Sequence, residues 1–263
     1  MSTPYGQDLF DAHLHVVDPR FELQTNQSYL PQPFTVDDYL ATAEPLGIVG
    51  GAVVSGSFQG FDQAYLRAAL IRLGPGFVGV TQLPVSADAA MIAPLDTVGV
   101  RALRFNLRRG VQQDWVGIDR LARLAFETAR WHAEFYLGAT ALVALETRLA
   151  ALPAIAIDHL GLERAALPAL LRLAEQGARI KASGFGRLDF DPAAAIAAIA
   201  SANPRALMFG TDLPSTRAPR PFSLSDLDVL CVALDDEALI RAALRDNARA
   251  LYRLTSPPES SVN

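Results

Sequence analysis

Short runs rich in apolar and β-branched residues alternate along nearly the whole chain with longer amphipathic runs rich in alanine and leucine. Runs of the first kind are typical of buried strands, and runs of the second kind are typical of helices that cover a sheet. Eight strands are predicted, at residues 8–15, 50–56, 77–83, 101–106, 132–137, 154–159, 179–183 and 206–211. Helices are predicted at residues 35–46, 62–73, 87–95, 115–130, 139–149, 167–176, 192–202, 223–233 and 237–252. Strands that alternate with helices favour one parallel sheet.

The number and length of these units predict a barrel. Eight strand–helix units in 263 residues average about 33 residues each, close to a minimal (β/α)8 barrel of ~250 residues. We therefore predict an α/β fold of the (β/α)8 TIM-barrel type. No linker divides the pattern, so residues 1–254 are expected to form a single domain. The proline- and serine-rich stretch 255–263 is expected to be a disordered tail.

Composition and charge narrow the functional classes. Apolar residues make up 51% of the chain and charged residues 19%, which is typical of a globular protein with a large core. A net charge of −5 argues against a nucleic-acid partner. No apolar run reaches the ~18 residues of a membrane span, and the first residues resemble no leader peptide. We expect no membrane partner and a cytoplasmic location, while the oligomeric state stays open.

Titratable residues gather where three of the predicted strands end. His13 and His15 end the first strand, His159 ends the sixth, and Asp212 follows the eighth. Each has a structural interpretation when it is taken alone: a chance pair of histidines, a helix-capping Asp158 beside His159, and a turn aspartate. Barrel enzymes carry their chemistry at this end of the strands. Together, these residues therefore predict a functional site.

Alternation along the strands refines this site. His13 and His15 are two residues apart and are expected to project from one face, with Asp11 a layer below them. The two imidazoles can then act as metal ligands or as a pair that polarises a carbonyl group. His132 begins the fifth predicted strand and is expected at the opposite end of the barrel in a structural role. Tyr136 is expected at the rim.

Arginines also follow the strand ends. Of the 23 basic residues 22 are arginines and Lys181 is the only lysine, a bias that codon usage can explain. Some of the arginines near the strand ends can be solvated loop residues. A guanidinium binds a carboxylate through a planar fork, so several of them around one rim predict a small anionic substrate that carries a carboxylate. The arginines concerned are Arg104, Arg108, Arg109, Arg187, Arg217 and Arg220.

Six short motifs occur in order over nearly the whole chain. They are FDAHLH at 10–15, VRALRFN at 100–106, WHAE at 131–134, IDHLG at 157–161, IKASG at 180–184 and GTDLP at 210–214. In these motifs the chain resembles the amidohydrolase superfamily, and in particular the amidohydrolase-related branch that contains the 2-pyrone-4,6-dicarboxylate lactonases. The resemblance implies a (β/α)8 barrel and a hydrolase that opens a carboxylate-bearing lactone.

The resemblance also implies roles for individual residues. Asp212 would activate the attacking water, and His13, His15 and His159 would polarise the scissile carbonyl. The carboxylates of the substrate would be bound by Arg104, by Arg108 or Arg109, and by Arg187, Tyr136, Ser57 and Tyr29.

The chain departs from the lactonase pattern at one position. An arginine follows the strand-six histidine by three residues in that pattern, and this chain has Leu162 there. The loss of a carboxylate-binding arginine leaves the identity of the substrate open. Arg164 is a candidate replacement.

The motifs also bear on whether a metal takes part. His13, His15 and Asp212 would supply the three protein ligands that catalytic zinc usually has, with His159 as a candidate fourth. However, the fifth strand offers Tyr136 where metal-dependent relatives have a histidine, and Arg104 disfavours a cation. The lactonases that the chain resembles work without a divalent metal. We therefore predict that no metal is required, with a site for zinc as the alternative.

Three other functions are compatible with the same fold. A metal-dependent hydrolase, or a non-oxidative decarboxylase on the same fold, would require the ion. A non-catalytic barrel that binds carboxylates would need no general base. The presence of Asp212 with three histidines at the strand ends argues against such a binding protein.

Overall fold

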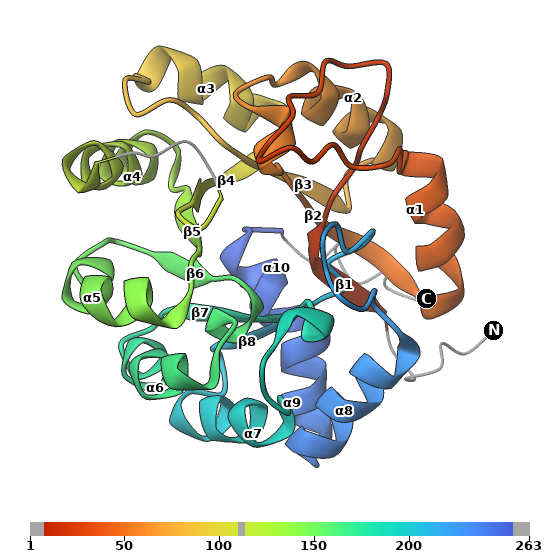
Figure 1. Cartoon of the computed structure of the whole chain (residues 1–263), viewed down its shortest axis with the longest axis vertical. Helices are drawn as coiled ribbons and strands as arrows, with labels where there is room; N and C mark the ends of the chain where they lie inside the picture. Colours follow the sequence, from red (N-terminus) through yellow and green to blue (C-terminus); the bar gives the residue numbers. More distant parts are fainter. Residues whose placement is uncertain (1–7, 110–113, 255–263) are drawn as a thin grey trace, which may run out of the picture.

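The computed structural model describes residues 8–109 and 114–254, in which eight strands lie inside a ring of helices (Figure 1). The strands pair in chain order from first to last, and every adjacent pair is parallel. The predicted single-domain (β/α)8 TIM barrel is thereby confirmed. The strands are β1 (Leu9–Leu14), β2 (Ile48–Val54), β3 (Phe77–Thr81), β4 (Val100–Asn106), β5 (His132–Tyr136), β6 (Ile155–Ile157), β7 (Arg179–Ser183) and β8 (Leu207–Gly210).

The helices of the outer ring cover the sheet with apolar faces. Polar side chains cap the N-termini of several of these helices. Thr35 accepts a hydrogen bond from the backbone of Asp38, and Asp114 accepts one from the backbone of Gly117. The helices are α1 (Val36–Ala43), α2 (Ala64–Leu73), α3 (Ala89–Thr97), α4 (Trp115–Ala129), α5 (Ala139–Ala150), α6 (Leu167–Glu175), α7 (Ala193–Ala202), α8 (Leu224–Leu234), α9 (Glu237–Arg241) and α10 (Asn247–Leu251). Within residues 8–109 and 114–254, none of them has the length and hydrophobicity that a membrane span requires.

The barrel closes between β1 and the segment that follows β8. The backbone N–H of Asp212 donates to the carbonyl of His13 at 2.7 Å, and that of His15 donates to the carbonyl of Leu213 at 2.8 Å. Gly210 permits this approach, because a Cβ atom there would lie only 2.8 Å from the backbone nitrogen of His13. Hydrogen bonds between main chains therefore fix Asp212 against the strand that carries the two histidines.

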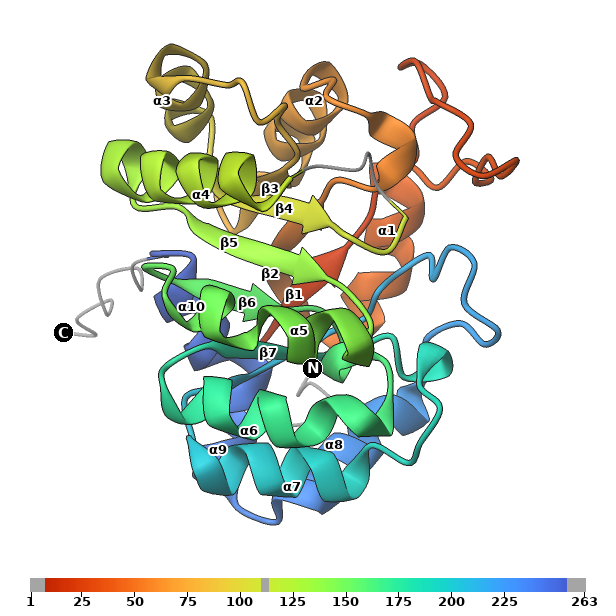
Figure 2. The same cartoon turned by 60° about the vertical axis from the view of Figure 1, so that its left-hand side comes forward.

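The C-terminal segment covers the other end of the barrel. Figure 2 shows α10 at the end of the strands that lies away from the loops after β1 and β8. Tyr252 follows α10 and is fully buried, with its ring 5.8 Å from that of Phe10 and 5.1 Å from that of His132. Small apolar side chains such as Ala12 and Ala156 pack around it. This end is closed, so access to the barrel interior is from the loop end.

Several predicted elements differ from the structure at their ends, and two of the differences have a clear backbone cause. β6 ends at Ile157, two residues earlier than predicted, because His159 and Leu160 adopt φ angles of 51° and 48° that no strand contains. The predicted helix at 237–252 is divided into α9, a π-helical segment (Ala242–Asp246) and α10. The predicted tail at 255–263 lies outside the described residues.

Candidate active site

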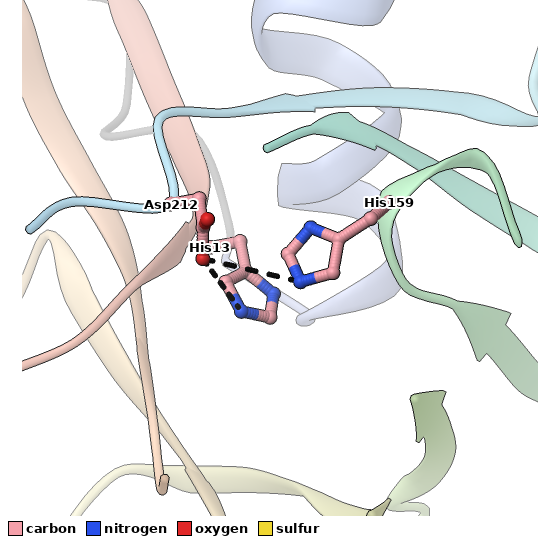
Figure 3. Close-up of side chains that lie close together, drawn as sticks. All are labelled: His13, His159 and Asp212. Carbon is pink, nitrogen blue, oxygen red and sulfur yellow. Dashed lines mark ion pairs between the residues drawn. The ribbon is translucent and has the colours of Figure 1, made fainter. Parts of the chain in front are cut away.

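Three histidines surround one carboxylate oxygen of Asp212. Figure 3 shows two of them, His13 and His159, with Asp212. His13 lies on β1, His15 follows that strand, His159 begins the turn after β6, and Asp212 follows β8. The Asp212 Oδ1 atom lies 3.6 Å from His15 Nε2 and 3.9 Å from the Nε2 atoms of both His13 and His159. All four side chains are buried. The structure thus brings together the four residues that the sequence singled out.

The second carboxylate oxygen of Asp212 is bound to Arg187. The Nε atom of Arg187 donates to Asp212 Oδ2 at 2.6 Å, and its Nη2 atom donates to the carbonyl of Thr216 at 2.8 Å. Burial alone would raise the pKa of the Asp212 carboxyl. The charge of Arg187, whose Nε donates to Oδ2, outweighs burial and holds this pKa well below its ordinary value. Asp212 is therefore ionised at neutral pH.

Each imidazole of the cluster has a partner for its Nδ1 atom, which orients Nε2 toward Asp212. Burial lowers the pKa of His159 to about 4 and that of His13 well below its ordinary value, so both rings are neutral at pH 7. The Nδ1 pairs are His15 with the Val54 carbonyl at 2.7 Å, His159 with Ser183 Oγ at 2.9 Å, and His13 with Lys181 Nζ at 3.2 Å.

A pocket of about 440 Å³, partly open to solvent, lies at the loop end of the barrel. His15 and His159 line it. Arg217 also lines it, although the sequence indicated no role for this arginine beyond its place near a strand end. Six of the seven residues predicted to bind the substrate also line this pocket. They are Arg104, Arg109, Arg187, Tyr136, Ser57 and Tyr29.

The structure distinguishes between Arg108 and Arg109. Arg108 is exposed and pairs with Glu163 at 3.2 Å, away from the pocket. Arg109 lines the pocket, and no carboxylate among residues 8–109 and 114–254 pairs with it. Burial lowers the pKa of the Arg109 guanidinium, and the nearby charges of Arg187 and Arg217 act in the same direction. Arg109 is therefore the member of the pair that can bind an anion in the pocket.

Arg104 is already engaged inside the protein. Its Nε and Nη2 atoms donate to Asp158 Oδ2 at 3.1 and 3.0 Å, and its Nη1 atom donates to the carbonyl of Ser55 at 3.0 Å. The guanidinium carbon lies 5.2 Å from the centre of the Tyr136 ring. Its fork is thus occupied by Asp158, and Arg104 contributes positive charge and one planar face to the pocket wall.

The position of the missing arginine is apolar in this structure. Leu162 is buried with φ of 70°, and its backbone N–H donates to the carbonyl of His159 at 2.8 Å. Arg164 is exposed and does not line the pocket. The suggestion that Arg164 replaces the missing arginine is therefore wrong.

The loop after β1 borders the pocket as a tight hairpin whose tip is closed by a bridge between Asn26 and Tyr29. The Asn26 side chain donates to the carbonyl of Arg109 at 2.8 Å. Arg217 donates to the carbonyl of Asn26, and its guanidinium carbon lies 4.4 Å from the centre of the Tyr29 ring. The loops after β1, β4 and β8 are therefore tied to one another at the mouth of the pocket.

A buried column of polar side chains extends below the histidine cluster. Lys181 on β7 forms an ion pair with Glu134 on β5, and its Nζ atom lies 3.5 Å from Asp158 Oδ1. Glu134 accepts a hydrogen bond from the Tyr252 hydroxyl at 2.6 Å and lies 3.0 Å from His132 Nε2 at the closed end, where His132 was predicted. Burial would raise the pKa of the Glu134 carboxyl, but Lys181 and His132 bring it below its ordinary value.

The sequence analysis did not identify Glu134 and Lys181 as site residues. The signal that could have found Lys181 is that the only lysine of the chain stands in a predicted buried strand, two residues before Ser183. A buried ammonium requires a carboxylate partner. In this structure that partner is Glu134 on β5.

Asp11 does not lie below His13 on the same face, so that prediction is wrong. A register shift between Asp11 and Leu14 interrupts the alternation of β1. The Asp11 carboxylate instead accepts hydrogen bonds from the backbone and hydroxyl of Thr211 at 2.8 and 2.6 Å, and from Tyr39 at 3.2 Å. Burial raises the pKa of the Asp11 carboxyl to about 6 despite these hydrogen bonds.

The ligand atoms of the histidine cluster are placed so that they could hold a metal ion. Asp212 Oδ1 and His13 Nε2 are buried and have no hydrogen-bond partner among the residues that the structure describes. His13, His159 and Asp212 each offer a ligand atom within 4.8 Å of the others, and His15 Nε2 faces the same oxygen. A second group, formed by His13, Glu134 and Asp158, is bridged by the ammonium of Lys181.

Comparison with known proteins adds to this geometry. A family model of amidohydrolases (Amidohydro_2) matches residues 10–254. A 2-pyrone-4,6-dicarboxylate hydrolase of Comamonas testosteroni is 30% identical over 156 residues, which cover 57% of this chain and 51% of that protein. A 4-sulfomuconolactone hydrolase of Rhizobium radiobacter is 32% identical over 98 residues, which cover 36% and 33%. The chain thus matches about half the length of the first relative and a third of the second.

A solved structure agrees over a longer span. A protein of Pseudomonas putida, assigned as a candidate 2-pyrone-4,6-dicarboxylic acid hydrolase, superposes with a TM-score of 0.77 at 26% identity. The match covers 95% of this chain and 99% of that one. The barrel is therefore shared in outline over nearly the whole of both chains.

Proposed function

The chain belongs to the amidohydrolase family, and from that premise we propose that it is a hydrolase that opens a lactone bearing one or more carboxylates, of the 2-pyrone-4,6-dicarboxylate type or related to it. One observation carries this proposal: an ionised Asp212, encircled by histidine Nε2 atoms, lies beneath a pocket walled by arginines. A carboxylate base, neutral imidazoles and fixed cations are the groups that ester hydrolysis of an anionic substrate needs.

In the proposed reaction Asp212 acts as the general base. Its Oδ1 atom takes a proton from a water molecule while the water oxygen attacks the lactone carbonyl carbon. Histidine N–H groups that face Asp212 Oδ1 stabilise the oxyanion that forms on the carbonyl oxygen of the lactone. The ring C–O bond then breaks, and Asp212 returns its proton to the leaving oxygen, so that a hydroxyl group and a carboxylic acid result, and the acid releases its proton to solvent. A low pKa makes Asp212 a weak base, which suits a lactone whose leaving oxygen is an activated enol.

The pocket wall would orient the substrate through its charged and hydroxyl groups. Arg187 holds Asp212 through Nε and is placed to bind a substrate carboxylate beside it. Arg109 has no carboxylate partner among the described residues and would bind a second anionic group. Ser57, Tyr29 and Tyr136 would add hydrogen bonds.

We further propose that no metal is required, because the buried charges already balance. The three carboxylates in the site and the column below it can be matched with three cations: Glu134 pairs with Lys181, Asp158 with Arg104, and Asp212 with Arg187. A divalent ion would add two positive charges to this balanced set. The balance supports hydrolysis by Asp212 and the histidines alone.

The alternative is a metal-dependent hydrolase or decarboxylase, which the unpartnered Asp212 Oδ1 and His13 Nε2 atoms favour. His13, His15 and Asp212 would hold the ion, with His159 as a fourth ligand. A bound zinc would lower the pKa of water and polarise a carbonyl.

A substrate screen tests the proposal. Purified protein would be assayed with mono- and dicarboxylated lactones, their methyl esters, and aromatic carboxylic acids as substrates for decarboxylation. We expect ring opening of at least one carboxylated lactone, recorded by loss of its absorbance and by pH-stat. Carbon dioxide release without ring opening would instead support the decarboxylase, and tight binding without turnover would support a carboxylate-binding barrel. The action of residues 1–254 as one unit and the cytoplasmic location stay predictions.

A further inference from the structure

The Nδ1 atom of His13 faces the ammonium of Lys181. Building on the proposed function, we propose that Lys181 is a positioning residue that fixes His13 in the tautomer whose Nε2 atom carries the proton. His13 then presents an N–H donor to the site, and it is not available as a metal ligand until that proton moves.

The hydrogen bond between the two side chains determines where the proton lies. An ammonium group has only donors, so Nδ1 of His13, 3.2 Å from Lys181 Nζ, must be the acceptor. A neutral imidazole carries one proton, which is then on Nε2. Asp158 Oδ1 also lies 3.3 Å from Nδ1 but makes no hydrogen bond among the described residues. Asp158 is the competing acceptor that would stabilise the other tautomer.

The buried column keeps Lys181 in this position. Its ammonium is paired with Glu134, and Glu134 is in turn held by the Tyr252 hydroxyl at 2.6 Å and by His132. All of these side chains are fully or almost fully buried, so water does not compete for their hydrogen bonds. The ion pair with Glu134 therefore holds the Lys181 ammonium in place, and the ammonium donates a hydrogen bond to His13 Nδ1.

His15 is in the opposite state. Its Nδ1 atom lies 2.7 Å from the carbonyl of Val54, and a carbonyl can only accept, so Nδ1 carries the proton and Nε2 has a free lone pair. The two histidines of one strand thus present different groups to Asp212: a donor from His13 and an acceptor from His15. A metal bound by both would need a lone pair on both Nε2 atoms.

Nuclear magnetic resonance of the four histidines tests the tautomers without any substrate. In protein with 15N-labelled histidine, each ring is assigned by single replacement with glutamine. We expect His13 to show an unprotonated Nδ1 and a protonated Nε2, with the reverse in His15. In Lys181→Met, the His13 proton should move to Nδ1, where Asp158 accepts it. A protonated Nδ1 of His13 in the unchanged protein would overturn the proposal.

Zinc binding gives a second readout. In equilibrium dialysis of chelator-treated protein, Lys181→Met should bind zinc at least tenfold more tightly than the unchanged chain. Tyr252→Phe is the matched control, because it weakens the same column at Glu134 without touching His13, and its zinc affinity should stay within about threefold of the original.

If Lys181→Met fails to fold, the double variant Lys181→Met/Glu134→Gln removes the ion pair as a unit and should show the same gain. Equal zinc affinity of the folded variant and the unchanged chain would contradict the proposal. Neither readout needs turnover, so a failure of the lactone screen would reject the proposed function without deciding this test.

Discussion

The ion pair between Lys181 and Glu134 makes a quantitative prediction about stability. Lys181→Met leaves the Glu134 carboxylate buried with hydrogen bonds from Tyr252 and His132 but without a cation. Loss of one partner of a buried ion pair destabilises a protein by about 3–5 kcal/mol, whereas replacement of both partners can be nearly neutral. The double variant Lys181→Met/Glu134→Gln is therefore expected to be more stable than the single variant.

The pH sets the size of this difference. In the unchanged chain Glu134 has a pKa below its ordinary value of 4.5, so the pair stabilises the fold above pH 4.5 and this contribution is lost as the pH falls. In Lys181→Met the same carboxyl is expected to have a raised pKa and to be protonated in the folded state. Protonating a carboxyl with a pKa of 4.5 at pH 7 costs about 3.4 kcal/mol, because pH 7 lies 2.5 pH units above that pKa and each unit costs about 1.36 kcal/mol. The uncompensated charge of Glu134 can therefore destabilise the fold of Lys181→Met by no more than about this amount at pH 7. Because the unfolded chain releases that proton, the single variant becomes less stable as the pH rises.

Thermal unfolding followed by circular dichroism measures this effect at pH 5.5, 6.5 and 7.5. The gap between the single and double variants should widen by up to about 1.4 kcal/mol per pH unit. At pH 7 the gap should correspond to about 7–14 °C in Tm for a protein of this size. A gap that stays constant with pH, or that narrows toward pH 7.5, would refute the assignment of a buried, charge-paired Glu134.

Three further predictions concern the reaction. Asp212→Asn should retain the fold and ligand binding while kcat falls by roughly 10²–10⁴-fold, and a variant that keeps most of its kcat on the true substrate would reject Asp212 as the base. Arg187→Met and Arg104→Met should weaken kcat/KM for acid substrates far more than for their methyl esters, and equal losses for acids and esters would mean that these arginines are structural. Protein treated with a strong chelator should keep its lactonase activity, and added zinc should change it little. Loss of activity on this treatment, restored by stoichiometric zinc or manganese, would establish a metal-dependent enzyme.

The fold could be predicted because its signal is local and repeated. Each strand is a short apolar run, and each is followed by an amphipathic helix, so the number and order of the elements follow from the pattern. The errors lie where tertiary contacts override that pattern. β6 ends early because the backbone at His159 and Leu160 turns into positive φ, and a π-helical segment divides the last predicted helix. Neither departure has a signature in residue types alone.

The candidate site shows the same division. His13, His15, His159 and Asp212 could be selected from the sequence, because the ends of parallel strands meet at one rim. The partners that determine their chemistry could not be selected in this way. Lys181 meets His13 across 168 residues of chain, and that contact depends on the register of the neighbouring strands. The register shift in β1 likewise removes Asp11 from the face on which strict alternation placed it.

The tie between the loops after β1, β4 and β8 separates the part of this barrel that must stay constant from the part that can diverge. The reacting groups lie at strand ends and are held by the hydrogen-bonded ladders of the barrel. The residues at the mouth lie on loops that are held by one another, through Asn26, Arg109, Arg217 and Tyr29. A change in one of these loops removes the anchor of the next, so the three are expected to evolve as a set. Descendants of one ancestor can then keep the same residues at the strand ends and the same hydrolytic chemistry, while a new set of loops admits an acid of a different shape.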